Sequence, residues 1–233
     1  MLLWSDSINP IEIGAGGTQF VKMSDGYPNY SPNSVQLINY DNKLNYTPSL
    51  RSFLVEYRAK LTDSMRCGVA SGAALLVSEK LLKILIGSKI ENYQYFEADV
   101  IHRKKHYTYY FFFIYGQNYD LVDYKNMTFY GESQPPYSHR LGTFDIEKIK
   151  RKEIKVENSD QIVNWQKLYP DYPNLKYEDL KLNRTNIHVD MIRLPFLLGG
   201  GYYVSEDLHN KIIEQKCTGI SFRTKDWSER PIL

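Results

Sequence analysis

Two histidines flank a basic turn at a spacing that some zinc sites use. His102 and His106 are four residues apart, with Arg-Lys-Lys between them. This spacing directs two imidazoles at one metal when both lie on one helix, as in metalloproteases. Here the flanking segments 93–101 and 106–115 alternate as strands do, so the pair crosses a turn, and no cysteine lies nearby. The sequence therefore predicts a solvated basic turn and no metal site.

Two serines follow extended apolar runs and are the first candidates for a nucleophile. Neither Ser78 nor Ser205 is flanked by the glycines of a nucleophile elbow, and neither has an evident histidine partner. Each is followed by glutamate and by apolar residues at helical spacing. A serine in that position caps a helix, and the glutamate after it suits the positive end of the helix dipole. We predict that both serines are N-caps.

The other patterns that could carry chemistry are weaker. Gly14-Ala15-Gly16-Gly17 lacks the Lys-Ser/Thr ending of a phosphate-binding loop and the helix pattern after it. The basic run 148–155 is interleaved with glutamates, which indicates a mixed solvated face rather than a nucleic-acid stripe. The carboxylates that could pair as acid and base are Asp120, Asp123, Glu178 and Asp179. Nothing in the sequence brings them together, so we expect neither catalysis nor a cofactor.

Aromatic side chains in two loops are the best candidates for a functional surface. One loop, over 166–180, is rich in tyrosine and proline, and the other contains Gln-Pro-Pro-Tyr at 134–137. The predicted partner-binding residues are Trp165, Tyr169, Tyr172, Tyr177 and Tyr137. Aromatic residues on ordered loops commonly anchor a partner. The alternative interpretation is that they pack down onto the core.

An internal repeat defines the elements that must position these residues. Aligned from Val77 and Val204, the segments 77–95 and 204–222 share six identities in nineteen positions. Each copy reads as strand, serine-capped helix and strand, with helices over 77–88 and 204–217. The alternative is coincidence, because Val-Ser-Glu-x-Leu is a common way to begin a helix after a strand.

Composition limits the class of protein. A hydrophobic content of 42% is enough for a core, and 20 tyrosines with 10 phenylalanines favour strands. A net charge of +2 is too small to argue for nucleic acid or an anionic membrane. Cys67 and Cys217 form no metal or disulfide pattern, the N-terminus lacks a signal-peptide pattern, and no apolar run could span a bilayer. We expect a soluble cytoplasmic protein.

The expected fold is α+β, with mainly antiparallel sheet, a few helices and two related strand-helix-strand lobes. We expect one domain over 1–233, with internal duplication around 73–115 and 186–226. Both faces of segment 107–115 are apolar, which predicts a central strand covered on both sides.

The C-terminal part resembles two families of bacterial immunity proteins. The residues that carry the resemblance are RLPFLLGGGYYVSEDL at 193–208 and TGISF at 218–222. Immunity protein family forty-three and the related Myxococcus-type family eleven similarly enter a helix through VSE-x-L and close on TG-(aliphatic)-x-F. The first copy, with the strands up to Tyr115 and Leu121-Val122-Asp123, resembles the middle of the family-eleven pattern. The resemblance covers roughly residues 50–130 and 186–226, and leaves out the first 50 residues and the Tyr/Pro-rich loop.

The resemblance implies a non-enzymatic antitoxin that binds a cognate secreted toxin domain in the cytoplasm. Two other classes remain open from the residues. One is a small enzyme or ligand-binding domain whose site is assembled from distant residues. The other is an adaptor protein of a secretion apparatus.

Overall fold

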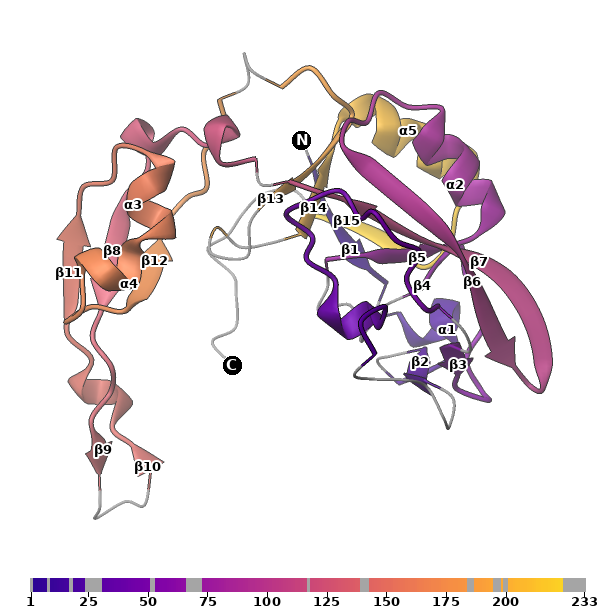
Figure 1. Ribbon diagram of the computed structural model, residues 1–233, viewed down its shortest axis with the longest axis horizontal. Coiled ribbons are helices and arrows are strands. Elements are labelled where there is room, and N and C mark those ends of the chain that lie inside the picture. The colour runs from indigo at the N-terminus through magenta and orange to yellow at the C-terminus, as the bar shows by residue number, and fades with distance from the viewer. Residues whose placement is uncertain are drawn as a thin grey trace. The chain divides into compact units, whose positions relative to one another are not determined.

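The computed structural model describes residues 2–7, 9–16, 19–23, 31–50, 53–65, 73–116, 118–138, 143–183, 187–194, 198 and 201–223. They form two compact units, whereas the sequence predicts a single domain over 1–233. Unit 1 contains the described residues of 1–117, 188–194 and 200–225, and unit 2 those of 118–187 and 195–199. The α+β class is confirmed, since mainly antiparallel sheets combine with short helices (Figure 1). Among the described helices, none has the length and apolar run of a membrane span.

The larger sheet of unit 1 has six strands in the order β2-β3-β6-β7-β5-β4. Only β3 and β6 pair in parallel, and the other neighbours are antiparallel. The strands are β2 (Phe20–Met23), β3 (Phe53–Val55), β4 (Ser64–Met65), β5 (Leu75–Val77), β6 (Tyr93–His102) and β7 (Lys105–Ile114).

The second sheet of unit 1 has four antiparallel strands in the order β13-β14-β1-β15. They are β1 (Leu2–Asp6), β13 (Met191–Leu194), β14 (Gly201–Val204) and β15 (Ile220–Arg223). The helical segments of unit 1 are α1 (Pro10–Ile13), the 3-10 turn η1 (Val35–Leu37), α2 (Glu79–Ile86) and α5 (Glu206–Glu214). Both helices that the repeat predicts are therefore present, but each is shorter than predicted, because Val77 and Val204 end β5 and β14 and the serines after them are N-caps.

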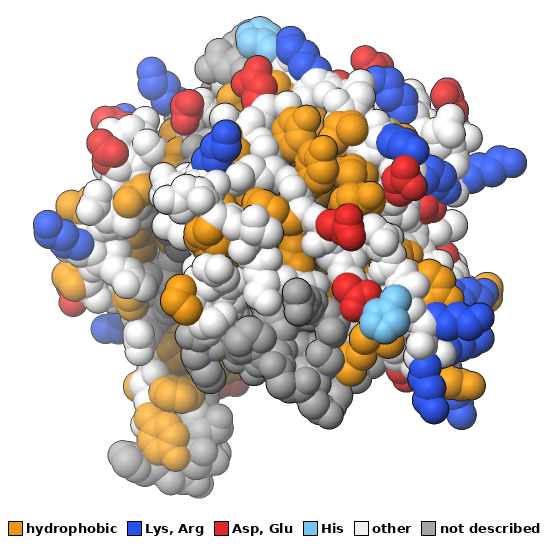
Figure 2. All heavy atoms as spheres, turned by 45° about the vertical axis from the view of Figure 1, so that its right-hand side comes forward, with side chains coloured by type: hydrophobic (Ala, Val, Ile, Leu, Met, Phe, Trp, Pro, Cys, Tyr) orange, Lys and Arg blue, Asp and Glu red, His pale blue; other side chains and the backbone are white. Residues whose placement is uncertain are grey.

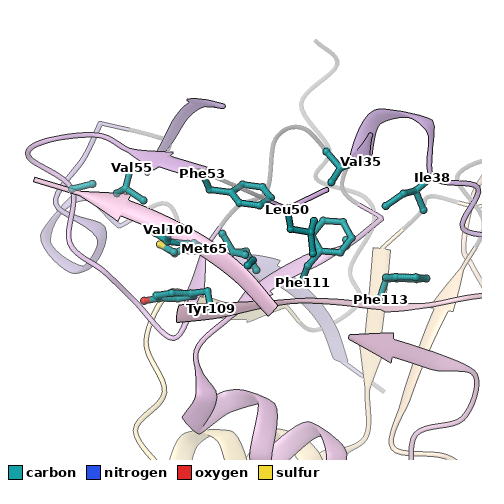
Figure 3. Packing of buried hydrophobic residues seen from close by; sticks show 14 of the residues in the cluster. Val35, Ile38, Leu50, Phe53, Val55, Met65, Val100, Tyr109, Phe111 and Phe113 are labelled. Carbon is teal, nitrogen blue, oxygen red and sulfur yellow. The ribbon is translucent and has the colours of Figure 1, made fainter. Parts of the chain in front are cut away.

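Strand β7 has an apolar cluster on each face, as its sequence predicts. Phe111 and Phe113 belong to a core with residues of β3, β6 and η1 (Figure 3). Phe112 and Ile114 belong to a second core, which includes side chains of α2, α5 and both sheets. All four side chains are at least 98% buried. Alternation along one strand thus joins the two cores of unit 1.

The two repeat copies pair their strands in the same register. The four strands β4-β5-β7-β6 correspond in order and direction to β13-β14-β1-β15. The equivalent cross-strand pairs are Ser64↔Val77 with Met191↔Val204, Val77↔Tyr110 with Val204↔Leu2, and Tyr95↔Phe112 with Trp4↔Phe222. The N-terminal strand β1 therefore takes the place in the second copy that β7 takes in the first.

In each copy, an aspartate that immediately precedes a strand, β4 or β13, bonds to the capping serine. The Ser78 hydroxyl donates to Asp63 Oδ1 at 2.7 Å and accepts from the Leu81 amide at 3.3 Å. In the second copy, the Ser205 hydroxyl donates to Asp190 Oδ1 at 2.8 Å and accepts from the Leu208 amide. Asp63 and Asp190 are separated by the same 127 residues as Val77 and Val204.

Each aspartate also binds the segment that follows the other copy's helix. Asp63 Oδ2 accepts from the Thr218 amide, and Asp190 Oδ2 accepts from the Lys89 amide, both at 2.9 Å. Burial alone would raise the pKa of Asp63, but hydrogen bonds from Lys80, Ser78 and Thr218 hold that pKa below its usual value. The two copies are therefore tied to each other by reciprocal bonds at their helix N-termini.

Replacing either capping serine should destabilise unit 1 without abolishing the fold. We expect Ser78→Ala and Ser205→Ala each to lower the free energy of unfolding by about 1 kcal/mol, because an orphan helix amide loses its acceptor. Chemical denaturation followed by circular dichroism measures this. If a serine variant lost the protein's biological activity while its denaturation midpoint stayed unchanged, the capping role would be contradicted and the serine would have a chemical role.

Unit 2 contains a three-stranded antiparallel sheet in the order β11-β8-β12 and a separate hairpin of β9 and β10. The strands are β8 (Phe129–Glu132), β9 (Tyr137–Ser138), β10 (Thr143–Phe144), β11 (Arg151–Ile154) and β12 (Asn174–Tyr177). Its helical segments are η3 (Tyr119–Leu121), η4 (Tyr124–Asn126), η5 (Ile146–Lys148), α3 (Ser159–Val163) and α4 (Trp165–Leu168).

Candidate partner-binding surface

Trp165, the first of the predicted binding residues, is a packing residue of unit 2. Its side chain is 2% exposed at the first position of α4. The indole Nε1 donates to the backbone oxygen of Tyr172 at 2.8 Å, and the ring lies against Gly131 of β8. A side chain this buried cannot contact a partner without rearrangement. For Trp165, the structure favours the alternative interpretation that it anchors a loop to the core.

Tyr169 and Tyr172 lie beside this tryptophan and are partly exposed. The Tyr169 ring centroid is 4.5 Å from that of Trp165, and Lys152 Nζ lies 6.0 Å from the centre of the Tyr172 ring. Leu168, next to Tyr169, is 50% exposed. Aromatic rings fixed on a buried neighbour lose little freedom on binding, which suits an anchor for a protein partner. We call Leu168, Tyr169 and Tyr172 the α4 surface.

The remaining two predicted residues do not join the α4 surface as exposed neighbours. Tyr177 is in β12 and partly buried, with its ring 6.3 Å from that of Phe129. Tyr137 is in β9 and 50% exposed, with its ring edge-on to Phe144 at 5.5 Å. Phe144 is itself 58% exposed, so the β9–β10 hairpin carries a second apolar pair. The assignment of partner binding to the five aromatic residues stays a prediction.

The two histidines have separate environments. His102 is buried, with Nε2 3.3 Å from the backbone oxygen of Tyr57, whereas His106 is exposed, with Nδ1 2.8 Å from Asp99 Oδ1. Within the described ranges, no group of three or more histidine, cysteine or acidic residues is arranged to hold a metal ion. The glycine segment at 14 ends α1, with Gly14 at a φ of 69°, while Gly17 lies outside the described residues.

Two of the carboxylates considered as acid or base accept hydrogen bonds from nearby side chains, and the Cys217 thiol has a raised pKa. Asp123 accepts from Asn126 Nδ2 at 2.7 Å, and Glu178 accepts from the Tyr130 hydroxyl at 2.6 Å. Cys217 is a free thiol whose pKa is raised to about 11, first by burial and then by the charge of Asp63. Little thiolate therefore exists at neutral pH, which disfavours a nucleophilic role. Cys67 lies outside the described residues.

Sequence reasoning missed the aspartates that connect the two repeat copies. The signal was present, because Asp63-Ser-Met-Arg and Asp190-Met-Ile-Arg share aspartate and arginine at the offset of the repeat. It lies outside the segments 77–95 and 204–222, and an aspartate gives no indication of its partner until the strand register is known.

Comparison of the chain with protein-family models, with curated proteins and with solved structures finds no match. A functional proposal therefore depends on the residues that carry the resemblance and on the surfaces described above.

Proposed function

We propose that this protein is an immunity protein, which binds the toxic domain of a cognate secreted toxin in the cytoplasm and holds it inactive. The resemblance at 193–208 and 218–222 motivates the class of function. The single structural observation that supports it is the α4 surface, where Tyr169 packs against buried Trp165 beside exposed Leu168. This arrangement suits a binding protein because it offers apolar area on a fixed support.

The site of action follows from this proposal. An inhibitor in the cytoplasm protects against a toxin that acts there, such as a nuclease, a nucleotide-consuming enzyme or a protein-modifying transferase. It gives no protection against a cell-wall hydrolase acting outside. Binding must be tight and stoichiometric, because the protein inhibits without turnover.

Co-expression with the toxin encoded by the neighbouring gene tests the proposal. We expect the wild-type protein to restore growth and to co-purify with the toxin domain. The variant Tyr169→Ala/Tyr172→Ala should weaken binding by about 2 kcal/mol or more per anchor, or at least about thirtyfold in Kd for each. The Trp165 indole still has its acceptor in this variant, because it bonds to the Tyr172 backbone.

The matched control is Tyr95→Ala, which removes a 44% exposed tyrosine from unit 1. It should protect as well as the wild type. Failure of the wild-type protein to protect would overturn the immunity proposal. Equal affinity of all three proteins for the toxin would move the interface away from the α4 surface and leave the function standing.

A further inference from the structure

The β6–β7 hairpin presents a group of cations at its turn. Its two strands pair continuously from Tyr93↔Ile114 to His102↔Lys105. The turn residues Arg103 and Lys104 have φ values of 51° and 66°, as the two-residue turn of a tight hairpin requires. Side chains at 103–108 are all exposed. The turn is therefore a fixed, convex point at the end of a long two-stranded arm (Figure 1).

Arg103 is held in place by the neighbouring loop rather than by a carboxylate. Its Nε donates to the backbone oxygen of Tyr57 at 3.0 Å, and its guanidinium lies 5.3 Å from the centre of the Tyr57 ring. That ring is 73% exposed. The arginine is thus oriented before any partner arrives, while part of its guanidinium still faces outward.

Four cations gather at this turn and in the loop beside it. Among the described residues, no ion pair is found for Arg58, Arg103, Lys104 or Lys105. By contrast, Lys83, Lys148 and Arg151 each lie within 3.0 Å of a carboxylate. Figure 2 looks toward the side from which the hairpin projects, and blue side chains gather at its lower right edge. We call these four residues with Tyr57 the basic tip.

We infer that the basic tip docks into an acidic recess of a protein partner, which under the proposed function is the toxin domain. The identity of the partner rests on that function. A protein is favoured over nucleic acid because the cations converge on one convex point instead of spreading along a face. Glu56, Glu97 and Asp99 lie on the adjoining strand and loop positions, and would repel a continuous phosphate backbone. An acidic recess of limited size can meet the turn at Arg103 and Lys104 without reaching Glu97 and Asp99, which lie further along β6.

Reversing the charge of the tip should slow association with the partner in a salt-sensitive way. The test variant is Lys104→Asp/Lys105→Glu, in which aspartate tolerates the positive φ at 104. The matched control, Lys125→Glu/Lys150→Glu, reverses two exposed lysines of unit 2 and gives the same net charge. Binding of the purified toxin domain is followed by surface plasmon resonance at low and high salt.

We expect the tip variant to associate about tenfold more slowly at low salt, with the difference shrinking at high salt, because exposed charges are then screened. The control should remain within about twofold of the wild type. Equal losses in both variants, or none in either, would overturn the inference while wild-type binding upholds the proposed function. No binding by the wild type would refute the function and the docking together. A random duplex DNA oligonucleotide serves as a parallel probe. If it binds the wild type and this binding is lost in the tip variant, the partner of the basic tip is nucleic acid and the acidic-protein inference is overturned.

Discussion

Gly219→Ala should lower the free energy of unfolding of unit 1 by more than about 3 kcal/mol, because it combines backbone strain with a collision. Gly219 has a φ of 81°, and a Cβ there would overlap the Ser64 carbonyl oxygen and lie 2.7 Å from Thr62 Cβ. Both neighbours are fixed, since the Ser64 amide donates to the Thr218 oxygen and the Thr62 hydroxyl to the Ser64 oxygen. The methyl group therefore has no space unless the two repeat copies separate.

Gly116 supplies the control for strain without collision. Its φ is 89°, yet nothing lies within 4 Å of the point that an alanine Cβ would occupy, so Gly116→Ala should cost only about 1–2 kcal/mol. Gly16→Ala, at a φ outside the left-handed region and in open space, should cost less still. Denaturant titration of the three variants separates the two effects. Equal midpoints for Gly219→Ala and Gly116→Ala would show that the contact between the copies is soft.

Local sequence patterns predicted those strands and helix beginnings that are determined by neighbouring residues. The alternation at 93–101 and 106–115 predicted β6 and β7, and the serine followed by glutamate predicted the beginnings of α2 and α5. These features follow from backbone hydrogen bonds and side-chain direction within a few residues. The offset of the repeat also pairs Gly219, between α5 and β15, with Asn92, between α2 and β6, and both have a positive φ, 81° and 54°.

The pairing of strands that are far apart in the sequence could not be predicted from local patterns. β1 lies between β14 and β15, although about 200 residues of sequence separate it from either. Its residues Leu2 to Asp6 have no local signal for that position, because pairing depends on which edge the rest of the fold leaves available. The division into two compact units likewise has no local signal in the sequence. No low-complexity sequence separates residues 118–187 from the residues before and after them.

The aromatic loop shows the same limit at the candidate site. Sequence could propose that Trp165, Tyr169 and Tyr172 act together, since they are close along the chain. It could not say which ring faces inward, because the sheet of unit 2 decides this through Gly131. The glycine leaves room for Tyr172 Cβ, which would lie 2.6 Å from a Cβ at 131, and for the indole of Trp165. The space left at Gly131 of β8, a strand distant in sequence, therefore determines that Trp165 is the buried support and that Tyr169 and Tyr172 are the partly exposed rings.

Trp165→Ala should destabilise unit 2 by about 3–5 kcal/mol, the cost of a large cavity at a buried aromatic. The variant removes a 2% exposed indole, its ring contact with Tyr169 and its bond to the Tyr172 oxygen. Limited proteolysis with mass spectrometry should show new cleavage within 118–187 while unit 1 stays protected. Val163→Ala, at a 56% exposed position of α3, should change stability by about 0.5 kcal/mol or less.

Protease resistance of unit 2 decides how any loss of protection is interpreted. Under the proposed function, if Trp165 supports the α4 surface, Trp165→Ala should lose toxin binding together with resistance to proteolysis, and Trp165→Phe should recover part of both because a ring again fills the space. Tyr169→Ala, by contrast, loses binding while unit 2 keeps its resistance. Loss of binding by Trp165→Ala at unchanged protease resistance would mean that the indole contacts the partner directly, contrary to its burial. The pair of substitutions thus separates a residue that builds the α4 surface from one that would contact the proposed partner.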